Sequence, residues 1–441
     1  MLRRAADRSA SALPGIDLSE HRLANGLRVV LSEDHNVPVA AVNVWYDAGS
    51  RHDPPGRSGL AHLFCMLMFQ GSAQVEGNDH FNLVQRCGGS LNGTTSFERA
   101  NYFQTVPAHH LELVLWLEAD RMGSLLTTMS NYDIQTCGDI VKNERRQRYD
   151  AVPYGDAFER LTAMMYPEGS AYHHTPIGSN SDRGRITLKE AQEFFRTYYT
   201  PNNTVMAVVG DIDPEQTLAW VDKYFGSIPA NYALPTLPTS GITEKTMMGE
   251  RREHVVADVP QSAFMAAFRL PRDGSRECDA ADLALTILGG GESSRLYNRL
   301  VRRDGLAASA GFGLLRLAGA PSLGWLDVKS IDVTTEKLDA IDNAIDEEMD
   351  RFAIEGPSPD ELERAQAKLE REWLDRLGTV AGRADEFCRY AVLFGDAQLA
   401  LSSLGNVLDV SADEVRAVAA RHLRRGNRAV VTYEPSMARD Y

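Results

Sequence analysis

The sequence contains few cysteines and no long apolar run. Five cysteines among 441 residues, at irregular spacing, do not form the framework of a disulfide-stapled secreted domain, and they suit a reducing cytoplasm. No segment approaches the roughly 18 consecutive apolar residues of a membrane-spanning helix. The start, 1–8, is charged, and no apolar segment follows it. We therefore expect no secretory signal, no membrane partner and a cytoplasmic location.

Positive charge is also scarce. The chain has 46 Lys and Arg against 61 Asp and Glu, which gives a formal net charge of −15. Affinity for nucleic acids rests on clustered Lys and Arg, so we expect no nucleic-acid partner. With 43% hydrophobic and 24% charged residues, the composition is that of a globular protein. The length exceeds one ordinary core and predicts two or more domains.

Hydrophobic periodicity predicts an alternation of strands and helices. Segments 22–32 and 37–48 alternate apolar and polar residues around Asp34-His35-Asn36, which predicts a hairpin. Two more strands are expected at 90–96 and 101–106, and a buried strand at 204–210. Helices are expected at about 57–70, 79–88, 108–123, 131–150, 154–166 and 187–199, and from Pro214 to about Phe225.

The second half repeats the first. The stretch from Thr187 through Asn203 to the 204–210 strand aligns without a gap to the stretch from Ser411 through Asn427 to 433, and both open with a capping-box pattern. Residues 37–41 are echoed by 259–263. This duplication predicts an α+β fold with two homologous domains related by a pseudo-two-fold, each a mostly antiparallel sheet with helices packed on it. The expected boundaries are 1–230 for the N-terminal domain, 231–240 for a linker and 241–441 for the C-terminal domain.

The stretch from Gly59 to Ser72 is an apolar run with a single His, which predicts a buried helix. It resembles the metal-binding helix of the pitrilysin-type metallopeptidases, or inverzincins, whose motif is His-x-x-Glu-His. In that motif the two His residues bind zinc and the Glu activates the attacking water. The first His is present as His62. Cys65 stands at the Glu position and Met66 at the second His.

Further stretches extend the resemblance over nearly the whole chain. They are 91–96 (Leu-Asn-Gly-Thr-Thr-Ser), 117–122 (Leu-Glu-Ala-Asp-Arg-Met), 141–147 (Val-Lys-Asn-Glu-Arg-Arg-Gln), 210–214 (Gly-Asp-Ile-Asp-Pro) and 289–297 (Gly-Gly-Gly-Glu-Ser-Ser-Arg-Leu-Tyr). In this order and spacing they are specific. The resemblance is to short, two-domain bacterial subunits related to the mitochondrial processing peptidase.

The resemblance also implies which zinc-peptidase groups are missing. The family's third zinc ligand is a Glu on a later helix, and Glu144 occupies that place. His62 and Glu144 are then the residual ligand positions, and two protein ligands hold zinc poorly. Loss of a general base lowers a rate by about 10²–10⁴-fold. With Cys65 at that position, we assign no catalytic residue and expect no bound cofactor, with zinc as the alternative.

Cys65 and Cys137 allow three interpretations. Both thiols could fill space once used by polar catalytic groups, since a free Cys behaves as a small hydrophobe. Alternatively, His62, Cys65, Cys137 and Glu144 form a closed, structural four-ligand metal site. A third possibility is a redox bond between Cys65 and Cys137.

Two further stretches bear on peptide binding. Leu91, Asn92, Gly93, Thr94 and Thr95 resemble the edge strand on which family members bind extended peptides by strand addition, the alternative being an ordinary solvent-side strand. In the second half, the family's peptide-clamping Arg and Tyr are replaced by Val301 and Ala308.

The resemblance implies a non-catalytic subunit. Family members enclose peptides in a chamber of four homologous domains, so a short chain needs a second subunit. We expect this chain to form half of such a chamber for a peptide substrate, beside an active homologous peptidase subunit in a heterodimer or larger assembly. One alternative is a metallopeptidase with a reworked metal site using His62, Cys65 and Glu144. A second is an architectural subunit of the respiratory core type.

Overall fold

The structure is a computed structural model that describes residues 16–235, 249–331 and 336–436. The chain divides into two compact units. The first unit contains Met1–Asn143, Pro176–Leu237 and Glu372–Gly405, and the second contains Glu144–Thr175, Pro238–Arg371 and Asn406–Tyr441. The predicted linker at 231–240 divides the chain into two continuous halves. In the structure, Glu144–Thr175 from the first half belongs to the second unit, and Glu372–Gly405 from the second half belongs to the first unit. Residues 236–240 of the predicted linker lie outside the described residues.

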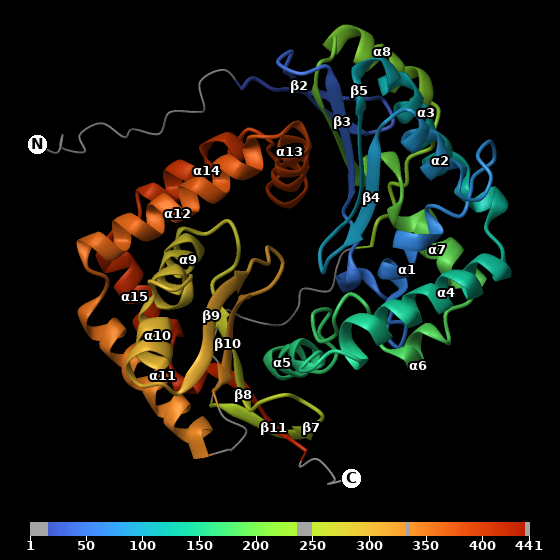
Figure 1. The fold of residues 1–441 in the computed structure, drawn as a ribbon. Helices are drawn as coiled ribbons and strands as arrows, with labels where there is room; N and C mark the ends of the chain where they lie inside the picture. Colours follow the sequence, from blue (N-terminus) through green and yellow to red (C-terminus); the bar gives the residue numbers. More distant parts are fainter. Residues whose placement is uncertain (1–15, 236–248, 332–335, 437–441) are drawn as a thin grey trace, which may run out of the picture. The chain divides into compact units, whose positions relative to one another are not determined.

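The first unit is built on a six-stranded sheet in the order β1-β2-β6-β3-β5-β4 (Figure 1). Its strands are β1 (Ser19–Arg22), β2 (Arg28–Glu33), β3 (Val39–Tyr46), β4 (Ser90–Thr95), β5 (Ala100–Pro107) and β6 (Thr204–Gly210). Neighbouring strands are antiparallel except for β2 and β6, which are parallel.

The second unit contains a five-stranded sheet in the order β7-β11-β8-β10-β9. Its strands are β7 (Arg251–Ala257), β8 (Ala263–Leu270), β9 (Ala307–Leu315), β10 (Ser322–Ser330) and β11 (Arg428–Pro435). Again a single pair, β7 and β11, is parallel. The order repeats that of the first sheet without β1, which confirms the predicted α+β fold of two homologous, mostly antiparallel domains.

Two asparagines show the duplication at the level of single hydrogen bonds. Asn203 donates from Nδ2 to the carbonyls of Asp47 (3.0 Å) and Tyr198 (2.8 Å). Asn427 donates in the same way to Arg269 and His422, at 2.8 Å each. Each Asn thus ties the C-terminus of a helix to the end of the strand beside it, and this shared role explains why the aligned stretches keep both residues.

The predicted hairpin is wrong. β2 and β3 are consecutive in the chain, but β6 lies between them, pairing parallel with β2 and antiparallel with β3. All seven residues of β6 are buried. A mostly apolar strand that is buried along its whole length is stabilised at the centre of a sheet, so this distant strand displaces the local pairing.

The helices of the first unit cover both faces of its sheet (Figure 1). They are α1 (Leu60–Leu67), α2 (Asp79–Arg86), α3 (Leu111–Thr128), α6 (Asn180–Arg183), α7 (Leu188–Tyr198), α8 (Pro214–Phe225) and α13 (Val380–Phe394); α4 (Asn131–Arg145) and α14 (Leu399–Leu408) begin in it. Helices α1 and α2 contact β4, and α3 contacts β3 and β5. On the opposite face α13, from late in the chain, contacts β3 and β6.

A half-buried carboxylate fixes α13 to the first sheet. The Asp385 Oδ1 atom accepts hydrogen bonds from Asn43 Nδ2 (2.9 Å), Trp45 Nε1 (2.9 Å) and Asn101 Nδ2 (3.1 Å). These three donors come from β3 and β5, and all are buried. Side chains of a strand alternate between its faces, so Asn43 and Trp45 both point toward α13. The exchanged segment is therefore held by specific polar bonds as well as by apolar packing.

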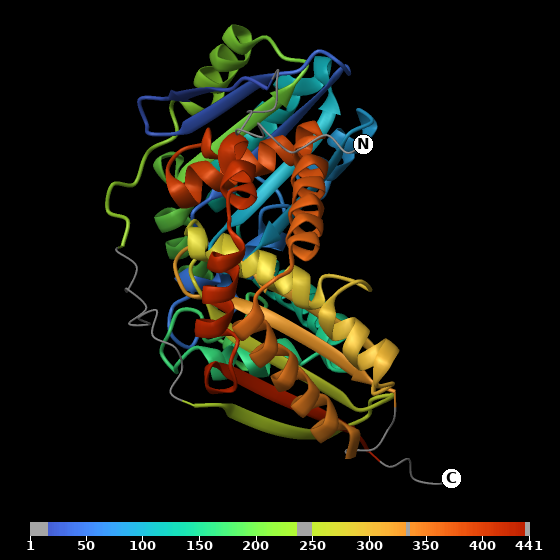
Figure 2. The ribbon, with the colours of Figure 1, turned by 90° about the vertical axis from the view of Figure 1, so that its left-hand side faces the viewer.

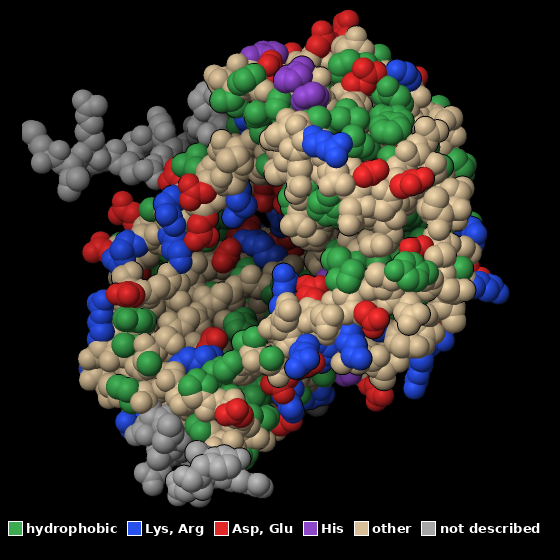
Figure 3. Space-filling view, turned by 45° about the vertical axis from the view of Figure 1, so that its right-hand side comes forward, with side chains coloured by type: hydrophobic (Ala, Val, Ile, Leu, Met, Phe, Trp, Pro, Cys, Tyr) green, Lys and Arg blue, Asp and Glu red, His purple; other side chains and the backbone are tan. Residues whose placement is uncertain are grey.

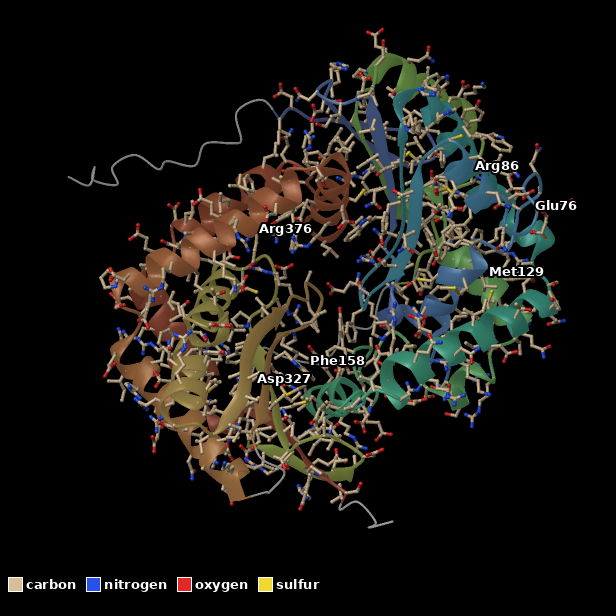
Figure 4. The ribbon with its side chains drawn as sticks, in the orientation of Figure 1. Glu76, Arg86, Met129, Phe158, Asp327 and Arg376 are labelled. Carbon is tan, nitrogen blue, oxygen red and sulfur yellow. The ribbon has the colours of Figure 1, made fainter. Side chains whose placement is uncertain are left out.

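The second unit mirrors this arrangement. Its helices are α5 (Ala157–Met165), α9 (Arg276–Gly289), α10 (Arg295–Tyr297), α11 (Glu336–Glu355) and α15 (Ala412–His422), and α12 (Pro359–Leu377) begins in it. Helices α9, α11 and α15 cover one face of the sheet (Figures 1 and 2). The exchanged helix α5 contacts β8 and β11. The centroid of its Phe158 ring lies 5.4 Å from that of the Trp325 ring of β10; Phe158 is labelled in Figure 4.

No single helix among the described residues is long and apolar enough to cross a membrane; by length and composition alone, the pair α13 and α14, bent by 84°, passes that test. On the face in Figure 3, Lys and Arg side chains are interspersed with Asp and Glu. This face thus carries no extended basic surface of the kind that binds nucleic acids.

Candidate functional site

Helix α1 carries the degenerate motif and begins at a glycine. Gly59 has a φ of 92°, and a Cβ atom there would lie 2.7 Å from the Ile177 carbonyl oxygen. The Asp53 carboxylate accepts hydrogen bonds from the amides of Gly59 (2.8 Å) and Ala61 (2.7 Å). These contacts explain why the helix begins at Leu60, three residues later than predicted.

Asp53 is a site residue that the sequence reasoning missed. Burial raises its pKa to about 8, against the opposing effect of the two amide bonds and of the His62 charge. A carboxyl group that resists ionisation therefore lies close to the residual ligand position His62. No local sequence signal marks this role, because Asp53 lies six residues before the N-cap residue Gly59 and reaches the helix start only through the fold of the loop.

The three motif positions of α1 differ in burial. Cys65 is buried, at 3% exposure, whereas His62 and Met66 are half-buried. His62 and Met66 lie four residues apart and so share one face of the helix. Where the family has a second imidazole, this face carries an apolar thioether, which is not among the usual protein ligands of zinc.

The Cys65 thiol faces the edge strand. Its Sγ atom lies 2.8 Å from the hydroxyl of Thr95 on β4. The carbonyl of the preceding residue, Phe64, accepts a bond of 3.0 Å from the buried Tyr102 hydroxyl of β5. The motif turn of α1 is therefore bound to the edge strand β4 and to its neighbour β5. Position 65 contributes packing and a polar contact where the family has an acid.

Cys137 and Glu144 both lie on α4, but they belong to different units. Cys137 is buried, and burial, assisted by the charge of Asp133, raises the pKa of its thiol to about 12. Glu144 forms an ion pair of 3.0 Å with Arg148, one turn further on. A thiol with so high a pKa is protonated at neutral pH, and it would have to release this proton to bind a metal.

The described residues do not gather a metal site. Nowhere in residues 16–235, 249–331 and 336–436 do three His, Cys, Asp or Glu side chains lie together so that they could hold a metal ion. The four-ligand arrangement of His62, Cys65, Cys137 and Glu144 is thus not assembled, and all five cysteines are free thiols. Met66 also puts a thioether where the family has its second zinc-binding imidazole, so the described residues do not reproduce the family's zinc site.

The predicted peptide strand is the outermost strand of its sheet. β4 contains Leu91 to Thr95 and pairs with β5 alone. Asn92 is exposed, and its Oδ1 atom accepts the Gly93 amide at 2.8 Å. A Cβ atom on Gly93 would lie 2.8 Å from the Tyr102 ring, so only glycine fits between β4 and that ring. A strand at the edge of a sheet has backbone N–H and C=O groups that can pair with another extended chain.

Three of the family-like stretches have structural roles. In 117–122, Glu118 and Arg121 form a buried ion pair in α3. In 141–147, Arg145 binds both carboxylate oxygens of Glu159, at 2.6 Å each. In 289–297, Arg295 binds Glu361 in the same forked way. Each of these stretches therefore contributes an ion pair within or between helices.

Comparisons with known proteins agree with this geometry. Residues 28–174 match the family model of insulinase, peptidase family M16, and 185–369 match that of the peptidase M16 inactive domain. Zinc protease PqqE of Helicobacter pylori is 32% identical over 292 residues, which cover 65% of this chain and 64% of that protein. Mitochondrial cytochrome b-c1 complex subunit 1 of Homo sapiens is 26% identical over 272 residues, 60% of this chain and 54% of that one.

A solved structure matches over the full length. The crystal structure of a protease from Helicobacter pylori superimposes with a TM-score of 0.85 and 26% identity, covering 95% of this chain and 100% of that one. The matched sequence regions of PqqE and of the human subunit each span less than two thirds of those proteins. With both M16 domain types matched in order and the fold shared throughout, the chain belongs to peptidase family M16.

Proposed function

We propose that this chain is a non-catalytic subunit of a heteromeric zinc peptidase. It forms half of a peptide-enclosing chamber and supports proteolysis or peptide maturation by an active homologous subunit. Its free cysteines favour a cytoplasmic location. The observation that carries the proposal is Cys65: a buried thiol, bonded to Thr95, stands where family members have the acid that activates water.

The neighbouring positions support the same interpretation. Met66 replaces the second imidazole, and the buried Cys137 thiol has a raised pKa. Neither change harms a protein whose partner performs the chemistry. The similarity to mitochondrial cytochrome b-c1 complex subunit 1, which is by name a subunit of a complex, supports a role as a subunit of an assembly. The edge strand β4 is then the element that offers peptide binding without catalysis.

The test measures metal content and peptide cleavage on the same preparation. The purified chain is expected to contain far less than one zinc per chain and to cleave no peptide. Cleavage is expected when a homologous chain with an intact His-x-x-Glu-His motif is added, at a rate above that of the homologue alone. About one zinc per chain, with cleavage in the absence of a homologue, would overturn the proposal and favour the reworked metal site.

A stable assembly with a homologue, without any gain in cleavage, would also overturn the proposal. It would favour the architectural alternative, in which the chain only supports an assembly. Size-exclusion chromatography with light scattering, run on the same mixture, separates failure to assemble from assembly without activity.

A further inference from the structure

The second unit contains a small cavity between the C-terminal end of α9 and the first half of α12. Its volume is about 50 Å³. The end of α9 contributes Thr286 and Ile287, and the following loop contributes Gly290, Ser293 and Ser294. A volume of about 10–15 Å³ holds one water. The cavity is therefore large enough for a group of a few oxygen atoms.

Two glycines allow the backbone beside this cavity to pack closely against its neighbours. A Cβ atom on Gly290 would lie 2.5 Å from the Thr286 carbonyl oxygen. One on Gly289 would lie 2.4 Å from the Phe312 Cβ atom and 2.6 Å from its backbone nitrogen. The ammonium group of Lys368 donates to the Gly290 carbonyl and so ties α12 to the loop. The loop conformation is thus fixed by backbone contacts that only glycine allows.

A buried hydroxyl in the cavity lacks a hydrogen-bond partner. Ser294 is 5% exposed, and its Oγ atom makes no hydrogen bond within the described residues. A buried polar atom without a partner is unfavourable, and such atoms in native proteins normally bond to protein, water or a ligand. Ser294 is also one of the residues that line the cavity.

The charges around the cavity are predominantly positive. Arg364 and Lys368 lie four residues apart on α12, and both line it. The one carboxylate among the lining residues, Glu361, is matched by Arg295, which binds both of its oxygens at 2.7 Å. Two cations, Arg364 and Lys368, and one carboxylate therefore line the space, on a chain whose net charge is −15. This local reversal of sign favours an anion.

We propose that the cavity binds a small oxyanion, held by the Ser294 hydroxyl, the Arg364 guanidinium and the Lys368 ammonium. Inorganic phosphate and a peptide carboxylate both fit this description, because the oxygens of either group accept charge-assisted hydrogen bonds from these donors. The site lies wholly within the second unit, and it does not depend on the proposed peptidase role.

Calorimetric titration of the full chain with inorganic phosphate, at constant ionic strength in chloride, tests the site. One saturable site is expected. Arg364→Gln and Lys368→Gln should each weaken phosphate binding at least about tenfold, since each removes a charged donor. Arg421→Gln is the matched control: it removes one exposed positive charge from α15 in the same unit and should leave the affinity unchanged.

Ser294→Ala separates a binding role from a structural one. The substitution removes a buried hydroxyl that has no partner, so stability without phosphate should be unchanged or slightly higher. Phosphate binding, and the rise in melting temperature that it causes, should both decrease.

A second arm titrates a short peptide with a free C-terminal carboxylate and its amidated counterpart. Binding of the free acid alone, weakened by Arg364→Gln, would identify a peptide carboxylate as the ligand. Binding of phosphate alone would identify phosphate. The proposal fails if neither anion binds saturably, or if Arg364→Gln and Ser294→Ala both bind as the parent protein does.

Discussion

The Cys65 thiol of α1 lies 2.8 Å from the Thr95 hydroxyl of β4. In this family, position 65 is where the acid that activates water is expected, and β4 is the expected peptide strand. A polar contact within the protein thus occupies the place where catalytic group and substrate strand would face each other. Because the thiol is buried and held, its role is to pack α1 against the edge of the sheet.

Replacing the thiol should therefore change stability and leave activity intact. Cys65→Ala is expected to lower the free energy of unfolding by about 1–2 kcal/mol, because it leaves a small void and removes the contact with Thr95. Denaturant unfolding measures this loss. Cleavage by the assembly with an active homologue should be unchanged, and a complete loss of cleavage would show that Cys65 acts in the chemistry.

Restoring the motif should restore metal binding. The double substitution Cys65→Glu with Met66→His rebuilds His-x-x-Glu-His around His62, and the variant is expected to bind about one zinc per chain by mass spectrometry of the metal. Adding Glu144→Gln should lower the zinc content sharply if Glu144 is the third ligand. If the triple variant retains full zinc, Glu144 is not a ligand.

Local signals in the sequence predict much of the fold. The capping boxes at Thr187 and Ser411 locate α7 and α15, and Asp213 with Pro214 locates the start of α8. The gapless alignment of these stretches predicts the duplication. Each of these features depends on residues within a few positions of one another, so sequence periodicity and capping chemistry are sufficient.

Non-local arrangements could not be predicted in the same way. The insertion of β6 between β2 and β3 depends on a strand about 170 residues further along the chain. Nothing near Asp385 shows that its helix covers the first sheet, because its partners come from β3 and β5. At the site, the sequence shows that Cys65 and Met66 replace the motif residues. The contact between Cys65 and Thr95 could not be predicted, because it depends on how α1 packs on β4.

The bonds of Asp385 predict a large loss of stability. Asp385→Ala leaves the buried donors of Asn43, Trp45 and Asn101 without their acceptor, and each such donor costs about 1–3 kcal/mol. We expect the free energy of unfolding to decrease by about 3 kcal/mol or more. Asp385→Asn keeps one oxygen acceptor and should lose less. The exposed Asp375→Ala is the control and should change stability by less than about 0.5 kcal/mol; similar losses for Asp375→Ala and Asp385→Ala would contradict this anchoring role.

The ion pair between Arg295 and Glu361 predicts a pH dependence of stability. The fork of two bonds to Arg295 lowers the pKa of Glu361 to about 2 from its usual 4.5. The native state binds fewer protons than the unfolded state between these values, so the stabilisation is fully present above about pH 4.5 and is lost as the pH falls through about 2. Its size at pH 7 is about 3 kcal/mol.

Glu361→Gln should remove this contribution. The difference in unfolding free energy between parent and variant, measured in urea, is expected to be largest at pH 7 and to shrink at pH 4 and again at pH 3. The exposed Glu363→Gln on the same helix serves as the control. A difference for Glu361→Gln that stays constant over this pH range would mean that the pair is not ionised as described.

If a peptide binds by adding a strand to β4, its affinity should depend on which of its backbone amides are free to donate hydrogen bonds. An extended peptide that pairs with an edge strand uses alternate amides for hydrogen bonds to it, and the other amides point away. N-methylation of one alternating set should weaken binding at least about tenfold, while methylation of the other set should have little effect. Fluorescence anisotropy of a labelled peptide, measured on the assembly, compares the two sets. Equal binding of both methylated peptides would show that β4 is an ordinary solvent-side strand, because side-chain contacts alone do not distinguish the two sets of amides.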